Sequence, residues 1–435
     1  MNGIRVGSWE QPKGGAVRLR YDPSWIASAQ GRPLSLSLPL TPEPAALSSQ
    51  AVSAYFDNLI PDNEAILRRL RERFHARSIS SFDLLAMVGR DCAGALQIVP
   101  ANEKPGDTRV IEAEVLSEAG VARLLRGASR GERFGSMDQD AFRLSLAGAQ
   151  EKTALLRHGG KWCLPRGATP STHIFKLPLG VIGNRGHDYR ESIENEWVCL
   201  ELMRELGHDV ARAEIAQFED QRTLVVERFD RRLSTSGKFW LRVPQEDFCQ
   251  VFALPPSRKY ESEGGPGIAS IVKKLRSSER GATDVFRFFE AQIVFWLLAA
   301  TDGHAKNFSI ELLAGGRYRS TPLYDVISAY PIMGRRNDQL DPRKARLAMA
   351  AVGKSPHYRL HEIHRWHWNE MSRQLRIAPP AGTRSILERM PTALDRVASK
   401  LPPAFPAHVF ESIDRGVRAA LLNLAREPDV QGGRK

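Results

Sequence analysis

The chain has 435 residues, of which 42% are hydrophobic and 26% are charged. At about 150 residues per domain, this length predicts two or three packed units and excludes a small disulfide-stapled scaffold. The composition is typical of a globular protein and excludes a largely disordered chain. Lys and Arg number 62 against 50 Asp and Glu, a net charge of +12, and residues 331–435 carry +9 of it, with 19 basic and 10 acidic residues. This surplus favours a phosphate-bearing partner without identifying one.

The start of the chain and its cysteines bear on the cellular compartment. No apolar run follows MNGIRVGSWE, so no secretory signal is expected. The longest apolar stretch, residues 291–300, is about half of the roughly 20 residues that a membrane-spanning helix needs. The four cysteines, Cys92, Cys163, Cys199 and Cys249, form no CxxC pair and fit reduced thiols. We therefore expect a cytoplasmic protein with no membrane partner.

The first hundred residues alternate short apolar segments with turn signals. The period-two pattern of AVRLRYDPSWIAS and GRPLSLSLPLTPEP predicts antiparallel strands. Residues 58–74 are predicted to form a capped amphipathic helix, and residues 81–88 a second, short one. The polar, Gly-rich segments 101–109 and 127–139 predict a domain junction at about residues 100–140.

Beyond residue 142 the pattern changes from strands to helices. Apolar runs around Gly159 and Gly160, followed by THIFKLP, predict a small β-rich layer. A helix over 193–206 is expected to pack on that layer, and a strand over 223–229 follows. The remainder predicts an α domain with helices at 245–254, 267–278, 283–300, 383–399 and 407–426. The polar segment 259–267 is expected to be a mobile loop, with ordering on binding near an active site as the alternative.

The cluster that indicates chemistry is DGHAKN, directly after an apolar helix. Asp302 and Asn307 are five positions apart, so one loop can place a carboxylate for a substrate hydroxyl proton and an amide oxygen for Mg²⁺. Asp325, after a Gly-Gly turn, can supply a second hard oxygen ligand. The alternative is structural: Asp302 caps a turn, His304 and Asn307 satisfy backbone groups, and Asp325 is an ordinary loop carboxylate.

Phosphoryl transfer also requires a cation and a loop that approaches the phosphates. Lys176 lies among apolar residues of a strand, where a buried ammonium needs an anion, with Glu194 or Glu196 as candidate orienting carboxylates. Its alternative is a strand-edge lysine in solvent. The small residues of 145–153 favour close approach of backbone N–H groups to an anion. No Walker A or GxGxxG sequence is present.

Six segments in this order resemble the HipA family, the serine/threonine kinase toxins of bacterial HipBA toxin-antitoxin modules: LAGAQEKTAL, THIFKLP, NEWVCLELM, VVERFDR, DGHAKNFS and LYDVISAYP. YFDNLIPDNEAILRRL and FDLLAMVGRDCAGALQ resemble the family's N-terminal domain, so the match covers nearly the whole chain. The resemblance implies an α+β, kinase-like, bilobal core. It divides the chain into an N-terminal α/β subdomain (1–105), an ATP-binding β-rich lobe (140–230) and an all-α catalytic lobe (231–435).

Carried over position by position, the resemblance implies Asp302 as catalytic base and Asn307 and Asp325 as Mg²⁺ ligands. Its implied ATP-binding residues are Ala147, Gly148, Ala149, Gln150, Glu151, Lys152, Lys176, Glu227, Arg228, Phe229, His304, Ala305, Lys306, Asn307, Tyr324 and Asp325. Ser145 matches the family's autophosphorylated serine, where a dianionic phosphate would repel ATP and eject the loop. Leu146 stands where the family often has Val or Ile, which leaves the assignments unchanged.

The resemblance also implies partners. They are a HipB-like helix-turn-helix antitoxin, operator DNA bound mainly through that antitoxin, and a protein substrate such as glutamyl-tRNA synthetase, whose phosphorylation would cause growth arrest and persistence. Arg373 and Arg376 are candidate DNA contacts, with a solvated basic face as the alternative. Two other functions stay open: a nucleotide-sensing corepressor, and a small-molecule kinase. The histidines of RLHEIHRWHW are expected to pack rather than to bind metal, because His361 and His367 would lie about 120° apart on one helix.

Overall fold

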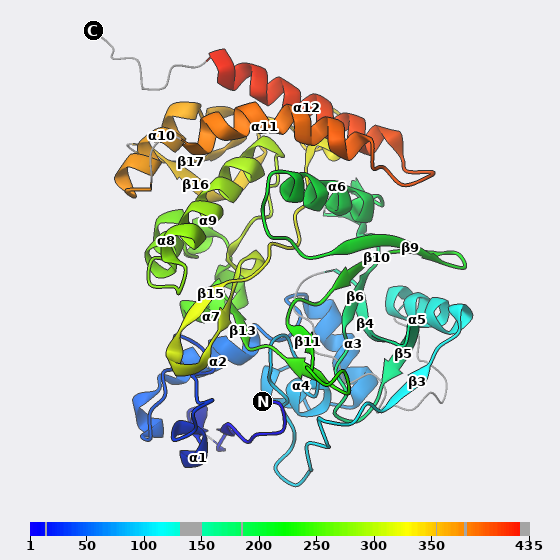
Figure 1. The fold of residues 1–435 in the computed structure, drawn as a ribbon, viewed down its shortest axis with the longest axis vertical. Helices are drawn as coiled ribbons and strands as arrows, with labels where there is room; N and C mark the ends of the chain where they lie inside the picture. The colour runs from blue at the N-terminus through cyan, green and yellow to red at the C-terminus, as the bar shows by residue number, and fades with distance from the viewer. Residues whose placement is uncertain (14, 131–149, 184–185, 354, 378–380, 427–435) are drawn as a thin grey trace. The chain divides into compact units, whose positions relative to one another are not determined.

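The computed structural model describes residues 1–13, 15–130, 150–183, 186–353, 355–377 and 381–426 (Figure 1). Packing divides the chain into two units. Unit 1 comprises Met1–Leu177, Ala216–Lys259 and Ser309–Tyr318, and unit 2 comprises Pro178–Ile215, Tyr260–Phe308 and Arg319–Lys435. The sequence-based division into 1–105, 140–230 and 231–435 consists of continuous segments. The two packed units differ from it because each combines segments that are distant in sequence.

The N-terminal part of unit 1 is more helical than its sequence pattern indicates. Its elements are β1 (Gly7–Glu10), β2 (Arg18–Tyr21), α1 (Pro23–Ile26), α2 (Ser49–Asp57), α3 (Glu64–Phe74) and α4 (Ser81–Val88). The Asn63 side chain caps α3 through the N–H groups of Ala65 and Ile66, so the predicted helix begins later than expected. The strand predicted in GRPLSLSLPLTPEP is wrong. Only a single bridge, between Ser35 and Leu38, forms there, because these residues pack individually into the core around α2 and α4.

A six-stranded sheet forms the second part of unit 1, in the order β3-β5-β4-β6-β10-β9. Its strands are β3 (Ala113–Val115), β4 (Lys152–His158), β5 (Lys161–Pro165), β6 (His173–Lys176), β9 (Ala213–Phe218) and β10 (Gln221–Glu227). Gly159 and Gly160 both have positive φ and close the predicted β4–β5 hairpin. Helix α5 (Glu118–Arg130), which sequence reasoning placed in a junction, packs its apolar side against Leu155, Phe175 and Val225 of this sheet (Figure 1).

Short strands complete unit 1. They are β11 (Arg231–Leu233), β12 (Trp240–Arg242), β13 (Gln245–Asp247) and β14 (Ser309–Leu312), and β15 (Tyr318–Ser320) follows β14. The helix predicted over 245–254 is mostly wrong. Residues 245–247 pair with β14, and only α7 (Phe248–Val251) is helical, starting at a capping box between Asp247 and Gln250.

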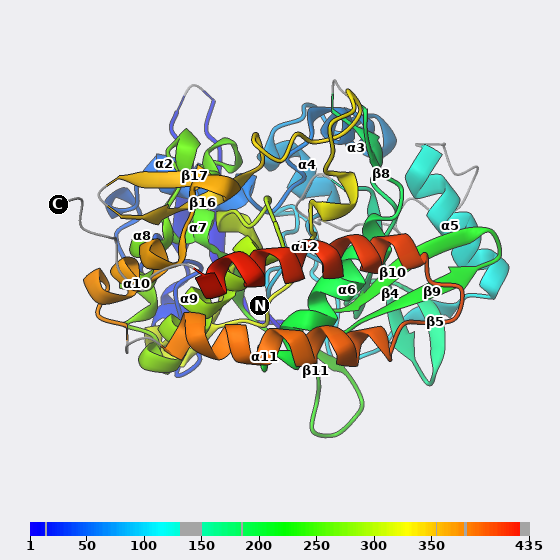
Figure 2. The same ribbon diagram turned by 90° about the horizontal axis from the view of Figure 1, so that it is seen from above.

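Unit 2 is built mainly from helices: α6 (Ser192–Glu205), α8 (Ile268–Leu275), α9 (Gly281–Leu297), α10 (Arg365–Gln374), α11 (Ala381–Ala398) and α12 (Ala407–Arg426). Figures 1 and 2 both show α11 and α12 side by side. Along α12, Val409, Ile413, Val417 and Leu421 are buried at a spacing of four residues, which is the stripe a surface helix needs.

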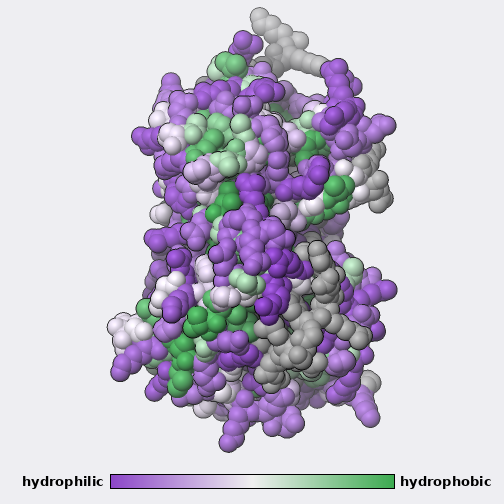
Figure 3. Space-filling model, turned by 90° about the vertical axis from the view of Figure 1, so that its right-hand side faces the viewer, coloured by the Kyte–Doolittle hydropathy of each residue, from purple (hydrophilic) through white to green (hydrophobic). Residues whose placement is uncertain are grey.

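The predicted all-helical part also contains strands. The hairpins β7 (Gly180–Ile182) with β8 (His187–Tyr189), and β16 (Arg346–Val352) with β17 (Pro356–Arg359), are antiparallel. Their exposed large hydrophobic side chains include Val181 and Ile182. The face drawn in Figure 3 is largely hydrophilic, and its hydrophobic residues gather in a few groups. Within the described residues, no helix is both long and apolar enough to span a membrane.

Candidate active site

The segment around residues 325–330 is tied to the C-terminal end of α9. Ser328 Oγ donates to the Leu298 carbonyl at 2.6 Å, and Tyr330 OH donates to the Leu297 carbonyl at 3.0 Å. Asn195 of α6 holds the same segment from the other side, because its Nδ2 donates to Ser328 O and its Oδ1 accepts from Ser328 N, both at 2.8 Å. The bonds to Leu298 and Leu297 use carbonyls that a helix end leaves without a partner. They bring two stretches of sequence together at the point where α9 stops.

The loop that begins at Asp302 follows directly. A Cβ at Gly303 would lie 2.4 Å from the Phe295 ring, so the loop can pass over α9 only with glycine at this position. The Asp302 side chain is 60% exposed. The N-cap position of the following 3₁₀ turn, η5 (Ala305–Asn307), is occupied by His304 and not by Asp302. Asp302 is therefore not the N-cap of this turn, which differs from the structural alternative.

Asn307 joins the two stretches. Its Nδ2 donates to the Asp302 carbonyl at 2.8 Å and to the Asp325 carbonyl at 3.4 Å. The Asn307 side chain thus does satisfy backbone groups, as the structural alternative expected. Because both bonds use the nitrogen, the amide oxygen is left for another partner. Amide and carboxylate oxygens are ligands that Mg²⁺ accepts, so the donor set at Asn307 and Asp325 fits this ion.

Asp325 adopts an uncommon backbone conformation. Its φ is +59°, in the left-handed region, which Asp and Asn enter more readily than most residues. Such conformations persist where neighbouring structure holds them, and they gather at functional sites. The neighbouring Tyr324 donates its hydroxyl to the Lys306 carbonyl at 2.9 Å, a second link between the two stretches. The hairpin expected after Asn307 is present, with a turn at Gly315 and Gly316.

The other loop residues predicted to contact ATP are buried, in contrast to Asp302. His304, Ala305 and Lys306 are 5%, 0% and 7% exposed. His304 Nε2 lies 3.9 Å from Asp302 Oδ1. Tyr189 is electrostatically coupled to Asp302: burial first, and the Asp302 carboxylate second, raise the pKa of Tyr189 to about 12. The predicted ATP contacts of these loop residues stay predictions.

Unit 1 places two predicted ATP-binding lysines opposite each other. In the β4–β6 pair, Lys152 is the register partner of Lys176, so both side chains leave the same face of the sheet. Lys176 is 8% exposed, which rules out the alternative of a strand-edge lysine in solvent. Glu194 and Glu196, the suggested orienting carboxylates, are each 1% exposed on α6 in unit 2, and their pairing with Lys176 stays a prediction.

The described end of the phosphate-loop candidate is anchored to β6. Gln150 Nε2 donates to the Leu177 carbonyl at 2.5 Å, and Leu177 N donates to the Glu151 carbonyl at 3.2 Å. The Glu151 side chain forms an ion pair with Arg69 of α3. Ser145, Ala147, Gly148 and Ala149 lie outside the described residues.

The linker candidate follows β10. Glu227 is exposed and Phe229 half-buried, whereas Arg228 is 4% exposed. The Arg228 N–H already donates to the Thr172 carbonyl at 2.9 Å. The adenine-binding role of Glu227, Arg228 and Phe229 stays a prediction.

The side chain of Arg228 belongs to a buried ionic network of Asp91, Arg228, Asp230, Arg231 and Arg242. Arg228 contacts Asp230 at 2.8 Å and Arg231 contacts Asp91 at 2.8 Å. Burial by itself raises the pKa of Asp91, but the three guanidinium groups outweigh it and hold that pKa well below its usual range. The network joins the segment after α4 to the segment after β10 within unit 1.

The two candidate DNA-contacting arginines are exposed near the end of α10. Arg373 is paired with Glu370 at 2.6 Å, and this hydrogen-bonded carboxylate raises the pKa of Arg373. Arg376 has a φ of +46° just beyond the helix. Their role stays a prediction.

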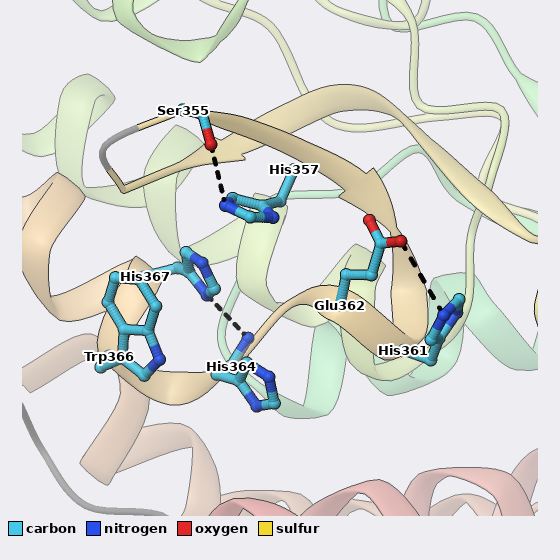
Figure 4. A pocket seen from close by; sticks show the side chains of 7 residues that line it. All are labelled: Ser355, His357, His361, Glu362, His364, Trp366 and His367. Atoms are coloured by element: carbon cyan, nitrogen blue, oxygen red, sulfur yellow. Dashed lines mark hydrogen bonds and ion pairs between the residues drawn. The ribbon is translucent and has the colours of Figure 1, made fainter. Parts of the chain in front are cut away.

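The histidine segment packs as expected, although not on one helix. His361 lies in a 3₁₀ turn, η8 (Leu360–Glu362), and His364 precedes α10. Around an open pocket of about 520 Å³, the His357 and His367 rings are 4.3 Å apart and Trp366 stacks on His367 at 3.6 Å (Figure 4). The His364 N–H donates to His367 Nδ1 at 2.9 Å, a capping bond. Among the described residues, no group of three His, Cys, Asp or Glu is arranged to hold a metal.

Sequence reasoning missed several residues that shape the site. Tyr189, Asn195 and Ser328 lie within or beside recognised motifs but carried no chemical signal of their own. Tyr260 donates a hydrogen bond to Asp302 Oδ1 and comes from the segment expected to be a mobile loop. The polar residues and glycines next to Tyr260 in the sequence gave no indication that its side chain has a fixed position.

Comparison with known proteins agrees with the geometry. A model described as the HipA-like C-terminal domain matches residues 144–399, and one described as the HipA N-terminal domain matches residues 1–99. The protein named "Putative kinase Y4mE" of Sinorhizobium fredii is 32% identical over 406 residues, covering 92% of this chain and 90% of that protein. The serine/threonine-protein kinase toxin HipA of Shewanella oneidensis is 28% identical, over 76% of this chain and 72% of the relative.

A solved structure extends the likeness to the fold. In the complex of Shewanella oneidensis HipA with HipB and operator DNA, one chain matches with a TM-score of 0.79 and 23% identity, over 99% of each chain. The fold class is therefore α+β and kinase-like, as the resemblance implied, with short strands added to the helical part. The family models together span most of the sequence. The chain belongs to the HipA family of kinase-like proteins.

Proposed function

We propose that this protein is a serine/threonine-protein kinase that transfers the γ-phosphate of MgATP, with Asp302 as the catalytic base. The observation that carries the proposal is the Asn307 amide, which joins the carbonyls of Asp302 and Asp325. These bonds support the proposal because they link the exposed Asp302 to Asn307 and Asp325, the two residues that we propose as oxygen ligands. A base and metal ligands are among the groups that phosphoryl transfer needs from the protein.

In the proposed reaction the acceptor hydroxyl oxygen attacks the γ-phosphorus and its proton passes to Asp302. The bond from the γ-phosphorus to the bridging oxygen breaks, and ADP leaves. Asn307 Oδ1 and the Asp325 carboxylate would hold Mg²⁺, which neutralises phosphate charge when bound. Lys152 and Lys176 supply positive charge for the phosphates, with Glu227, Arg228 and Phe229 as the adenine linker.

The family supports a wider role as the toxin of a toxin-antitoxin module. A relative is named a serine/threonine-protein kinase toxin, and the similar structure contains HipB and operator DNA. We extend these partners to this chain: a HipB-like antitoxin, and operator DNA bound mainly through it. The proposal has three further parts. The protein autophosphorylates Ser145, it phosphorylates a translation-related target such as an aminoacyl-tRNA synthetase, and it resides in the cytoplasm, where ATP is present.

The decisive experiment is transfer of radiolabel from γ-labelled ATP. Purified full-length protein is incubated with MgATP and a cell lysate, and labelled products are identified by mass spectrometry. We expect label on serine or threonine, lost in Asp302→Asn and unchanged in Asp338→Asn, an exposed aspartate of the same unit whose side chain pairs with Arg336 at the surface. Undiminished transfer by Asp302→Asn would refute the proposal, and label only on metabolites would favour the small-molecule kinase.

A corepressor role is the second candidate, favoured by the +9 charge of residues 331–435. It predicts ATP binding without transfer, and operator affinity with antitoxin that weakens when Arg373 and Arg376 are neutralised. Because phosphate contacts release counterions, that affinity must also fall with added salt. Salt-independent affinity would exclude it.

A further inference from the structure

Tyr260 lies directly against Asp302. Its hydroxyl donates a hydrogen bond to Asp302 Oδ1. Its ring meets the His304 ring edge to face, with centroids 5.1 Å apart and an interplanar angle of 81°. Tyr260 therefore contacts both the candidate base and the loop that carries it, and all three residues belong to unit 2.

The backbone around Tyr260 holds it in this position. Its carbonyl accepts from Glu263 N at 3.0 Å and from Gly265 N at 2.9 Å. This tight turn requires Gly264, whose φ is +91°. The segment is fastened to β16, because Glu261 Oε2 accepts from Ala350 N at 2.6 Å. The phenol is thus placed by the folded unit and needs no ligand to order it.

The two oxygens of Asp302 are used unequally. Within the described part of the chain, both polar contacts of its side chain, the Tyr260 hydrogen bond and the 3.9 Å approach of His304 Nε2, are made through Oδ1. A carboxylate can accept at both oxygens. With its side chain 60% exposed, Asp302 keeps Oδ2 available to a hydroxyl from solvent or substrate.

We infer that Tyr260 is a positioning residue for phosphoryl transfer: it anchors Asp302 through Oδ1 so that Oδ2 faces the acceptor hydroxyl. The inference rests on the proposed role of Asp302 as base. During transfer the acceptor proton moves to Oδ2, the new oxygen–phosphorus bond forms, the bond to ADP breaks, and the phenol keeps its own proton. Without the phenol the carboxylate rotates among its rotamers, and the alignment that lowers the barrier is lost.

The test is Tyr260→Phe, which keeps the ring against His304 and removes only the hydroxyl. Autophosphorylation of dephosphorylated full-length protein is followed against ATP concentration. We expect kcat to fall on the order of 10-fold while the half-saturating ATP concentration stays within about twofold, since alignment and not nucleotide binding is lost. The control is Tyr358→Phe, which removes a hydroxyl from β17 of the same unit while the ring keeps its contact with Arg346, and it should leave kcat unchanged.

Two outcomes would overturn the inference: an unchanged kcat in Tyr260→Phe, or a raised kcat, which would mean that the phenol competes with the acceptor hydroxyl. A double mutant tests whether Tyr260 acts through Asp302. In the Asp302→Asn background, removal of the phenol should lower residual transfer no further, whereas an independent structural role would give additive losses. If Asp302→Asn itself transfers normally, the proposed function fails. If only the Tyr260 expectations fail, that function stands.

Discussion

Replacing Asp91 by alanine should destabilise unit 1 strongly, because this carboxylate is the counterion of three buried arginines. Arg228, Arg231 and Arg242 have side chains exposed by 2%, 0% and 1%. Asp91 also accepts hydrogen bonds from Ser171 N at 2.9 Å and from Ser171 Oγ at 2.7 Å. The substitution leaves three guanidinium groups with one buried carboxylate, Asp230.

Removing one partner of a buried ion pair costs about 3–5 kcal/mol. That is a large share of the roughly 5–15 kcal/mol that separates folded from unfolded protein. For a unit of this size it corresponds to a fall in Tm of about 10 °C. The change has to appear in the unfolding of unit 1, since every network residue lies in that unit.

The measurement is urea unfolding of the parent and of Asp91→Ala, followed by hydrogen exchange at residues of the six-stranded sheet. The matched control is Asp220→Ala. Asp220 pairs with Arg126 at the surface of the same unit, and exposed ion pairs contribute little, so no resolvable change is expected. The reasoning is refuted if Asp91→Ala unfolds at the same urea concentration as the parent.

The same carboxylate gives a pH dependence. Because the pKa of Asp91 is depressed in the folded protein, its contribution is fully present above the unfolded pKa of about 4 and is lost as the pH falls below that value. The free energy of unfolding of the parent should therefore fall more steeply with decreasing pH below about pH 4. Asp91→Ala should lack that contribution.

Two further predictions concern the candidate site. Gly303→Ala should lower both activity and Tm, because its Cβ would lie 2.4 Å from the Phe295 ring, and overpacking of this kind costs about 1–3 kcal/mol. The control is Gly120→Ala, whose Cβ would meet its nearest neighbours at 3.5 Å and which, like Gly303, is not at positive φ; it should not lower Tm in thermal melts. Asp325→Asn should fold normally, since Asn also tolerates the left-handed backbone, yet require at least 10-fold more Mg²⁺ for half-maximal transfer; an unchanged Mg²⁺ dependence would exclude Asp325 as a ligand.

Local sequence signals predicted the elements whose formation depends on nearby residues. Helices α4, α9 and α12 have apolar patterns and recognisable ends. Gly159 and Gly160 predicted the β4–β5 turn. Prediction failed where packing overrides local preference. GRPLSLSLPL alternates like a strand but enters a helical core, and α5 lies in a stretch read as a junction.

The motif DGHAKN and Asp325 were recognisable from the sequence because the chemistry of phosphoryl transfer restricts residue type and order. Sequence could not show how they meet. That depends on hydrogen bonds between distant segments: Ser328 to Leu298, Asn195 to Ser328, and Asn307 to the Asp325 carbonyl.

By itself, then, the sequence determined the α+β class, the family and the identity of the candidate base and metal ligands, since these depend on residue type, order and short-range spacing. Only the tertiary structure decided that Arg228 is a buried ion-pair partner, that Lys152 and Lys176 share one face, and that Tyr260 holds Asp302. Each of these depends on side chains that are far apart along the chain, and their meeting is fixed by packing and burial, which no local pattern encodes.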